Sequence, residues 1–351
     1  MQWWPGTAGI PAGTLERRPS MVSYSQTRVT GSALCRAMWP VRHVPSIQPG
    51  ERQHMSAATS LRDRWLVDVP WLAAHLDDPD LRIVDMRGYV RTVDVGDGRQ
   101  AATYVGAPDE YAEQHIPGAI YLDWTRDIVD PDDPVPAQVA PPERFATELG
   151  RRGIGDEHLV VAYDEHPTAQ FATRLWWALR YYGHDRVAVL DGGLAAWRRD
   201  GRPLTSAVPA FPPAVFTPRV QPGWRATGEA VLAALGDAST TLVDARDEGQ
   251  YNGTVYRGEG RPGHIPGAIN LPRELLVDPA TGTFRSDEEL RAVFAQAGID
   301  PDKRVIAYCN GGVAATTVLF GLALTGHPSL TNYDGSWNEW GVRPDWPVEV
   351  P

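Results

Sequence analysis

Cysteine is scarce in this chain, which has only Cys35 and Cys309 among its 351 residues. The two stand in very different sequence contexts, so we expect no disulfide scaffold and favour a reducing, cytoplasmic compartment. No His or Cys pair has a recognised metal-ligand spacing, and we expect neither a metal nor another cofactor. The sequence also lacks an apolar run long enough to cross a bilayer, which argues against a membrane partner.

Basic charge is in short supply as well. Lysine and arginine number 33 against 44 aspartates and glutamates, and the formal net charge is −11. No basic run is interleaved with aromatic residues, so nothing in the chain is suited to neutralise phosphates and nucleic acid is not an expected partner. The length is sufficient for two domains of ordinary size, each with its own core.

Acidic residues are nearly missing from the first 54 residues, which contain only Glu16 and Glu51 but six arginines. This segment has no sustained periodicity and too little apolar patterning to order itself by burial. We expect a poorly ordered leader over residues 1–54. It is interpreted as an upstream extension of a protein that starts at Met55, with a targeting peptide as the alternative.

From about Leu61 onward the sequence repeats itself. An apolar strand ending in Asp-x-Arg occurs twice, and so does the hexapeptide His-Ile-Pro-Gly-Ala-Ile. The four pairs of landmarks are Leu81–Arg87 with Thr241–Arg246, His115–Ile120 with His264–Ile269, Val160–Asp164 with Val305–Cys309, and Leu190–Gly193 with Tyr333–Ser336. Because the pairs follow in the same order, they predict two structurally equivalent halves.

The segments between the landmarks have the periodicity of helices. Apolar residues recur at spacings of three and four over residues 143–150, 171–182, 286–297 and 314–324. Residues 159–163 and 305–308 are continuously apolar, as in parallel strands covered on both faces. The alternation predicts an α/β fold of two doubly wound domains, over residues 60–207 and 226–351, each a short parallel sheet flanked by helices. Proline-rich residues 208–225 are expected to link them.

The position of Cys309 is the most informative feature of the second half. It ends the apolar run Arg304–Tyr308 and is followed at once by a glycine-containing loop and a helical pattern. The first turn of a helix has unpartnered N–H groups and the positive end of the macrodipole, which favour a nucleophilic thiolate. We expect the sulfur to lie in an anion cradle made by Asn310, Gly311, Gly312, Val313 and Ala314.

The first half has a different residue at the equivalent point. Asp164 aligns with Cys309, and Glu165-His166-Pro167 align with the glycines. Without a thiol, this half is expected to be a structural partner that walls the cleft. A general-base role for Asp164 is the alternative.

The paired landmarks, the Tyr308-Cys309 loop and the ending Asp334–Trp340 resemble the rhodanese family of sulfurtransferases, over residues 60–350. The resemblance implies tandem rhodanese-like domains, of which the second is catalytic. It also implies that Cys309 takes up a sulfur atom as a persulfide and passes it to cyanide or a thiol. A cysteine phosphatase would need the Cys-x5-Arg cradle in which arginine grips phosphate, and position 315 is alanine.

The sulfur donor is less sharply indicated. The resemblance implies basic residues in the loop of thiosulfate users and a serine two residues after the cysteine in 3-mercaptopyruvate users, whereas this loop has Gly311 there. Gln250 stands where tandem members commonly have a donor-binding arginine. Arg257 and Arg261 are the nearest substitutes, unless they are solvated loop residues. We expect thiosulfate as donor, with 3-mercaptopyruvate, or a persulfide carrier that serves a protein partner, as alternatives.

Several other residues have a structural interpretation. Asp244 and Arg246 recur as Asp85 and Arg87 in the half without a thiol, which favours a fold-stabilising ion pair, with Arg246 at the border of the cleft. The two histidines of the repeated hexapeptides are expected to hold the turn before the next strand. Trp337 and Trp340 are expected to pack the last helix.

Overall fold

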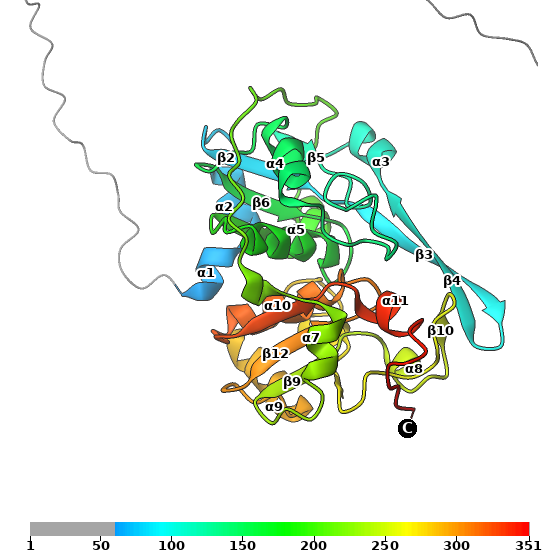
Figure 1. The fold of residues 1–351 in the computed structure, drawn as a ribbon. Coiled ribbons are helices and arrows are strands. Elements are labelled where there is room, and N and C mark those ends of the chain that lie inside the picture. Colours follow the sequence, from blue (N-terminus) through cyan, green and yellow to red (C-terminus); the bar gives the residue numbers. More distant parts are fainter. Residues whose placement is uncertain (1–59, 351) are drawn as a thin grey trace, which may run out of the picture. The chain divides into compact units, whose positions relative to one another are not determined.

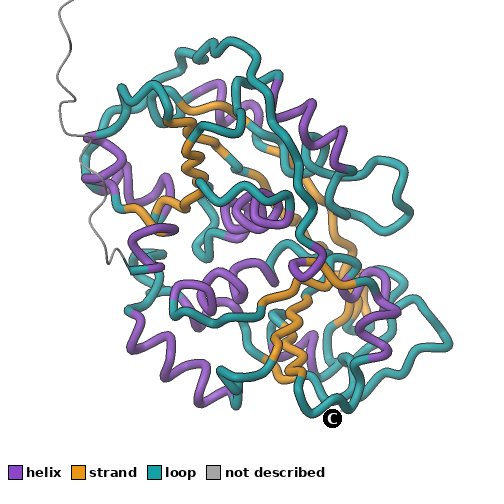
Figure 2. The backbone as a smooth tube through the Cα atoms, turned by 60° about the vertical axis from the view of Figure 1, so that its left-hand side comes forward, coloured by secondary structure: helices purple, strands orange, loops and turns teal. Residues whose placement is uncertain are grey.

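A computed structural model describes residues 60–350 of the protein (Figures 1 and 2). The leader expected over residues 1–54 lies outside this range. Within it, no helix is long and apolar enough to cross a membrane.

The first half is built on a five-stranded parallel sheet in the order β1-β7-β6-β2-β5. Its strands are β1 (Leu66–Val67), β2 (Leu81–Asp85), β5 (Ala119–Tyr121), β6 (Leu159–Tyr163) and β7 (Val187–Leu190). Its helices are α1 (Leu61–Trp65), α2 (Val69–Ala74), α3 (Pro108–Glu113), α4 (Pro142–Gly150), α5 (Gln170–Tyr181) and α6 (Gly193–Arg199). Strand β2 is buried along its whole length, as expected for a strand covered on both faces.

The second half repeats this arrangement with a parallel sheet in the order β11-β9-β12-β13-β8. Its strands are β8 (Arg225–Ala226), β9 (Thr240–Asp244), β11 (Ile269–Asn270), β12 (Arg304–Tyr308) and β13 (Leu330–Tyr333). Its helices are α7 (Gly228–Ala233), α8 (Glu248–Tyr251), α9 (Asp287–Ala297), α10 (Ala315–Leu324) and α11 (Ser336–Trp340), with the 3₁₀ turns η1 (Pro222–Trp224) and η2 (Arg273–Leu276). The predicted pair of doubly wound α/β domains is confirmed.

Helices α5 and α10 join the two halves (Figure 1). All ten residues of α10 are buried, and Phe320 packs edge-on against Trp176 with ring centroids 5.0 Å apart. The hydroxyls of Thr173 and Thr316 lie 3.0 Å apart across the contact. One hydrophobic cluster therefore contains residues of both halves.

The four predicted helices are confirmed to within one residue at each end, as α4, α5, α9 and α10. The predicted linker has no helix or strand between residues 206 and 221, and its last residue, Arg225, starts β8. The linker lies against the first half: the N–H of Ala214 donates to the carbonyl of Gly150 at 2.9 Å, and Phe216 is buried.

A long antiparallel hairpin, formed by β3 (Gly88–Gly96) and β4 (Arg99–Gly106), was not predicted. It extends from the first half to the second, where β10 (Tyr256–Arg257) pairs with β4 in parallel (Figure 1). A three-stranded sheet of its own thus links the two halves beside the cleft.

The histidines of the two hexapeptides occupy matching positions. His115 Nδ1 lies 2.7 Å from the carbonyl of Tyr111, and His264 Nδ1 lies 2.8 Å from that of Tyr251. The ring of His115 also stacks on Tyr111, and that of His264 stacks on Tyr251. The interpretation that they hold a turn is confirmed, as is the packing of Trp337 and Trp340, which are both buried in α11.

Candidate active site

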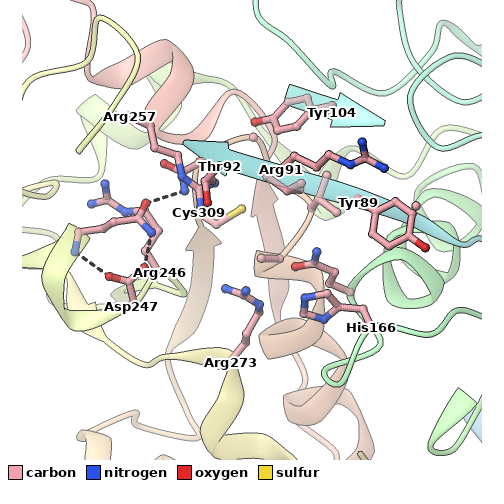
Figure 3. Close-up of a pocket in the computed structure, with 18 of the residues that line it drawn as sticks. Tyr89, Arg91, Thr92, Tyr104, His166, Arg246, Asp247, Arg257, Arg273 and Cys309 are labelled. Carbon is pink, nitrogen blue, oxygen red and sulfur yellow. Dashed lines mark hydrogen bonds between the residues drawn. The ribbon is translucent and has the colours of Figure 1, made fainter. Parts of the chain in front are cut away.

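A cavity of about 260 Å³ lies between the two halves and contains Cys309 (Figure 3). The second half contributes Arg246, Asp247, Gln250, Arg257, Arg273, Cys309, Asn310, Gly311, Val313 and Ala314 to its lining. The first half contributes Gly88, Tyr89, Val90, Arg91, Thr92, Tyr104, Trp124, His166 and Gln170. The expectation that the first half walls the cleft is confirmed.

Cys309 follows β12 and is held from both sides of its backbone. Its N–H donates to Ser336 Oγ at 3.1 Å, and its carbonyl accepts from the N–H of Trp337 at 3.0 Å. The Ser336 hydroxyl in turn donates to the carbonyl of Tyr333 at 2.7 Å. The start of α11 therefore fixes the cysteine, which is 3% exposed.

The loop after Cys309 keeps its amide groups free. Within residues 60–350, the N–H groups of Asn310, Gly311, Gly312, Val313 and Ala314 donate to no protein acceptor. They lead directly into α10, whose first residue is Ala315. Unpaired N–H groups at a helix start attract an anion, so the loop has the composition of the expected cradle.

The first half holds this loop in place through Arg174. Its guanidinium donates to the carbonyl of Gly312 at 3.1 Å and forms an ion pair with Asp334 at 2.6 Å. Both charged side chains are at most 1% exposed. Gly312 has φ +70°, and a Cβ there would lie 2.7 Å from the carbonyl oxygen of Asp334, so no other residue fits without a shift. The glycine turns its carbonyl outward to Arg174 rather than lining the cavity.

Arg246 is buried beneath the site and is paired with Asp244, Nη2 to Oδ2, at 2.6 Å. Burial opposes its charge, but Asp244 outweighs this and raises the pKa of Arg246. The guanidinium lies 4.4 Å from the Trp337 ring. The predicted ion pair and the position at the border of the cleft are both confirmed.

Gln250 reaches the cysteine loop. Its Oε1 accepts from Asn310 Nδ2 at 2.8 Å, and its Nε2 donates to Asp247. Both ends of the amide are thus engaged by neighbours, and in this arrangement Gln250 positions Asn310. The Oδ1 atom of Asn310 is buried without a partner in the described part of the chain.

The structure separates the two arginines that were expected to replace a donor-binding residue. Arg257, on β10, lines the cavity, and burial lowers its pKa, while the charges of Tyr104 and Cys309 act in the opposite direction. No carboxylate within residues 60–350 pairs with it. Arg261 instead donates to backbone carbonyls, among them that of Arg343 at 2.7 Å. The structure does not bring Arg261 to the cavity.

Several lining residues were missed by the sequence analysis. Arg273 begins η2, three residues after β11 ends, and His166 follows β6 in the first half. The rule that ligands bind beyond the carboxyl ends of parallel strands could have indicated both. Arg91 and Tyr104 come from the unpredicted hairpin.

Cys309 lies at the carboxyl end of a central parallel strand, in a loop of free amides and beside cationic side chains. These features are typical of sites in which a cysteine nucleophile acts on an anionic substrate. The sequence profile of the Rhodanese-like domain matches residues 68–200 and 227–342. The chain belongs to the rhodanese family of sulfurtransferases.

Its relatives have different names within that family. A protein from Escherichia coli strain K12 named 3-mercaptopyruvate sulfurtransferase is 37% identical over 290 residues, covering 81% of this chain and 98% of the relative. A putative thiosulfate sulfurtransferase from Mycobacterium bovis is 38% identical over 249 residues, covering 68% and 87%. The crystal structure of SseA from Escherichia coli, described as a 3-mercaptopyruvate sulfotransferase, matches with a TM-score of 0.67 at 34% identity and covers 78% and 98%.

Proposed function

We propose that this sulfurtransferase takes the outer sulfur of thiosulfate onto Cys309 and transfers it to cyanide or a thiol. The observation that carries the proposal is the loop of free amides from Asn310 to Ala314 around a fixed cysteine. Such donors stabilise charge as it forms, because they are already oriented and need no solvent.

In the first step, the Cys309 thiolate attacks the outer sulfur of thiosulfate. A new S–S bond forms, the old one breaks, and sulfite leaves with the bonding electron pair. The terminal sulfur of the persulfide carries the negative charge left on the enzyme. The amides of the loop face this sulfur and replace the water that the buried site excludes.

In the second step, an acceptor attacks the terminal sulfur and Cys309 leaves as a thiolate. With cyanide the product is thiocyanate, and with a thiol it is a hydropersulfide. Gln250 and Asn310 hold the loop during both steps, and Arg246 supports it from below.

Thiosulfate is favoured as donor because it carries two negative charges on a compact group. Arg257 lacks a carboxylate partner in the described residues and lies near enough for the charge of Cys309 to act on it. A buried guanidinium without a carboxylate partner is suited to bind an anionic oxygen of the donor. The second candidate, 3-mercaptopyruvate, is favoured by the Escherichia coli relative of that name, which matches over 98% of its length.

The test is sulfur transfer to cyanide, followed as thiocyanate, with thiosulfate and 3-mercaptopyruvate in parallel. We expect turnover that Cys309→Ser abolishes without loss of folding, and kcat/KM for the two donors decides between them. Retained turnover in the Cys309→Ser variant would contradict the proposal. A stable persulfide on Cys309 without turnover to small acceptors would favour the carrier for a protein partner.

The same proposal includes the domain division and the compartment. We place the non-catalytic domain at residues 60–207, the linker at 208–225 and the catalytic domain at 226–351. A cytoplasmic location suits a protein with two cysteines, one of them the nucleophile.

A further inference from the structure

Four arginines line the cavity, namely Arg91, Arg246, Arg257 and Arg273, and of these Arg246 is paired with the buried Asp244. Arg257 comes from β10 and Arg273 from η2, and Figure 3 shows them on different sides of Cys309. The charge of a Cys309 thiolate acts on Arg257, whereas Arg273 acts on the ring of His166 from the first half. The charge of Arg273 also acts on Arg257, so Arg273 extends the cationic part of the cavity from Arg257 toward His166.

Arg273 has unused hydrogen-bonding capacity. Its Nη2 lies 3.0 Å from the carboxylate of Glu274, which is 53% exposed, and such a pair with an exposed carboxylate contributes little. Its Nε is buried and has no partner among residues 60–350. An unsatisfied buried donor is costly, and an anionic ligand in the cavity would relieve that cost.

His166 adds a neutral donor beside this cation. Burial, together with Arg273, lowers the pKa of His166 to about 4, so the ring is neutral near pH 7. Its Nδ1 accepts from the N–H of Thr168 at 3.2 Å, which places the ring proton on Nε2. A neutral imidazole donates a hydrogen bond to a ligand and, unlike a carboxylate side chain, does not form an ion pair with Arg273.

Carboxylates are almost absent from the surroundings. Of the lining residues, all within the described range, Asp247 alone is acidic, and it accepts from the side chain and the backbone of Gln250. The wall formed by Arg273 and His166 therefore has a positive charge that no lining side chain neutralises. Apart from the half-exposed Glu274 outside the lining, a ligand is the group that can supply the counter-charge.

We infer that Arg273 and His166 form a subsite for the carboxylate of the sulfur acceptor, a small thiol that carries a negative charge away from its sulfur. The inference rests on the proposed function. Thiosulfate has its oxygens on the atom next to the transferred sulfur and so needs a cation close to Cys309. A carboxylate separated from a thiol by carbon atoms can instead reach Arg273, whose charge acts on His166 of the first half.

The transfer to this acceptor balances as follows. The proton of the acceptor thiol passes to the charged terminal sulfur of the Cys309 persulfide, and the resulting thiolate attacks that sulfur. The S–S bond to Cys309 breaks, its electron pair stays on Cys309 as a thiolate, and the acceptor departs as a hydropersulfide. Arg273 and His166 hold the carboxylate and take no part in the electron transfer.

The test isolates the second step. Full-length protein is loaded with sulfur from thiosulfate, freed of donor and mixed with one thiol, and the loss of persulfide is followed by quenching and mass spectrometry. The thiols are 3-mercaptopropionate, neutral 2-mercaptoethanol and cationic cysteamine. Arg273→Gln and Arg273→Lys are compared with Arg291→Gln, which removes the same charge from an exposed position on α9.

We expect Arg273→Gln to slow discharge by 3-mercaptopropionate about tenfold, to leave 2-mercaptoethanol unchanged and to speed cysteamine. Arg273→Lys should retain most of the preference for the anion, and Arg291→Gln all of it. A structural defect would slow the three thiols alike, so equal losses would overturn the inference. Loss of persulfide loading in Arg273→Gln would also overturn it, by assigning Arg273 to the donor. If wild-type protein accepts no sulfur on Cys309, the proposed function itself fails.

Discussion

The two halves differ in how the loop after the central strand uses its backbone N–H groups. In the first half the carboxylate of Asp164 accepts from the N–H groups of Phe171 at 2.7 Å, Ala172 at 3.0 Å and His166 at 3.0 Å. In the second half the N–H groups of residues 310–314 donate to nothing in the described chain, whereas those of Thr316 and Thr317, which match Phe171 and Ala172, donate to backbone carbonyls at 3.1 Å. A side chain of the protein fills the first cradle, and the second is left for a ligand.

The frames around the two cradles are nearly identical. Asp85 pairs with Arg87 at 2.7 Å and Asp244 with Arg246 at 2.6 Å. The tyrosine before each cradle accepts from an isoleucine N–H, at 3.2 Å for Tyr163 and 3.1 Å for Tyr308. Apart from the β3–β4 hairpin of the first half, the loop after the central strand is therefore the main difference between the two sites. Asp164 does not line the cavity, so it has no geometry for a general base.

Exchanging the two central residues should have the largest effect on activity. Cys309→Asp is expected to abolish sulfur transfer, because a carboxylate cannot carry a sulfane sulfur. Asp164→Cys in a Cys309→Ser background should stay inactive, since its loop has Glu165-His166-Pro167 in place of glycines and position 164 itself does not line the cavity. Thiocyanate formation measures both. Turnover by the double variant would show that any thiol after a central strand suffices.

Removing the charge that joins the halves should have the next largest effect. Arg174→Ala removes the closer partner of the buried Asp334 and leaves it with Arg225 at 3.3 Å, and we expect the free energy of unfolding to fall by about 3 kcal/mol. Arg198→Ala is the matched control in the same half, because its partner Glu165 is 39% exposed, and it should lose at most about 1 kcal/mol. Urea denaturation of both variants provides the measurement. Equal losses would mean that the ion pair does not hold the cysteine loop.

The filled cradle should make stability depend on pH. Burial raises the pKa of Asp164 to about 7, although three backbone N–H groups favour the charged form. The folded protein thus keeps a proton that the unfolded chain releases near pH 4, and this proton stabilises the fold most at low pH. The stability of wild type relative to Asp164→Asn should decrease from about pH 4 to about pH 7, by at most about 1.4 kcal/mol per unit, and level off above. Denaturant titrations across this range test it, and a difference that rises with pH would reverse the sign of the argument.

The repeated hexapeptides should respond equally to the same substitution. Gly118 has φ +80° and Gly267 φ +75°, and a Cβ at either would meet no atom within 4 Å. Gly118→Ala and Gly267→Ala should therefore each lower the free energy of unfolding by about 1 kcal/mol, because alanine disfavours the left-handed backbone conformation. Thermal or chemical unfolding of the two variants measures it. A much larger loss in one half would reveal a difference between frames that look the same.

The sequence allowed the doubled architecture and the reactive loop to be predicted because both depend on local patterns. The ion pair of the Asp-x-Arg pattern forms between two residues that are neighbours in sequence. The reactive loop is likewise contained in one short segment, in which Cys309 is followed by Asn310 and two glycines. The four predicted helices were found to within a residue because their apolar faces repeat along the chain.

The remaining parts of the site depend on contacts between distant segments. The hairpin has a recognisable turn at Gly96-Asp97-Gly98, but its pairing with β10 joins residues far apart in sequence. Arg273 enters the cavity because β11 lies beside β9, and Arg261 leaves it because a backbone carbonyl of Arg343 is close. No local pattern separates these two arginines.

The pairing of β10 with β4 also affects how the protein is made. The first half is synthesised before the second, and until Tyr256 and Arg257 have followed, the outer edge of β4 has no neighbour. An open strand edge can pair with another chain, and the hairpin also exposes Val93 and Val95 on its other strand. The ribosome-bound chain therefore passes through a period in which it is prone to associate. The short strand that places Arg257 in the cleft also covers the first two residues of that edge, Arg99 and Gln100, so it shortens the exposed edge as well as contributing to the site.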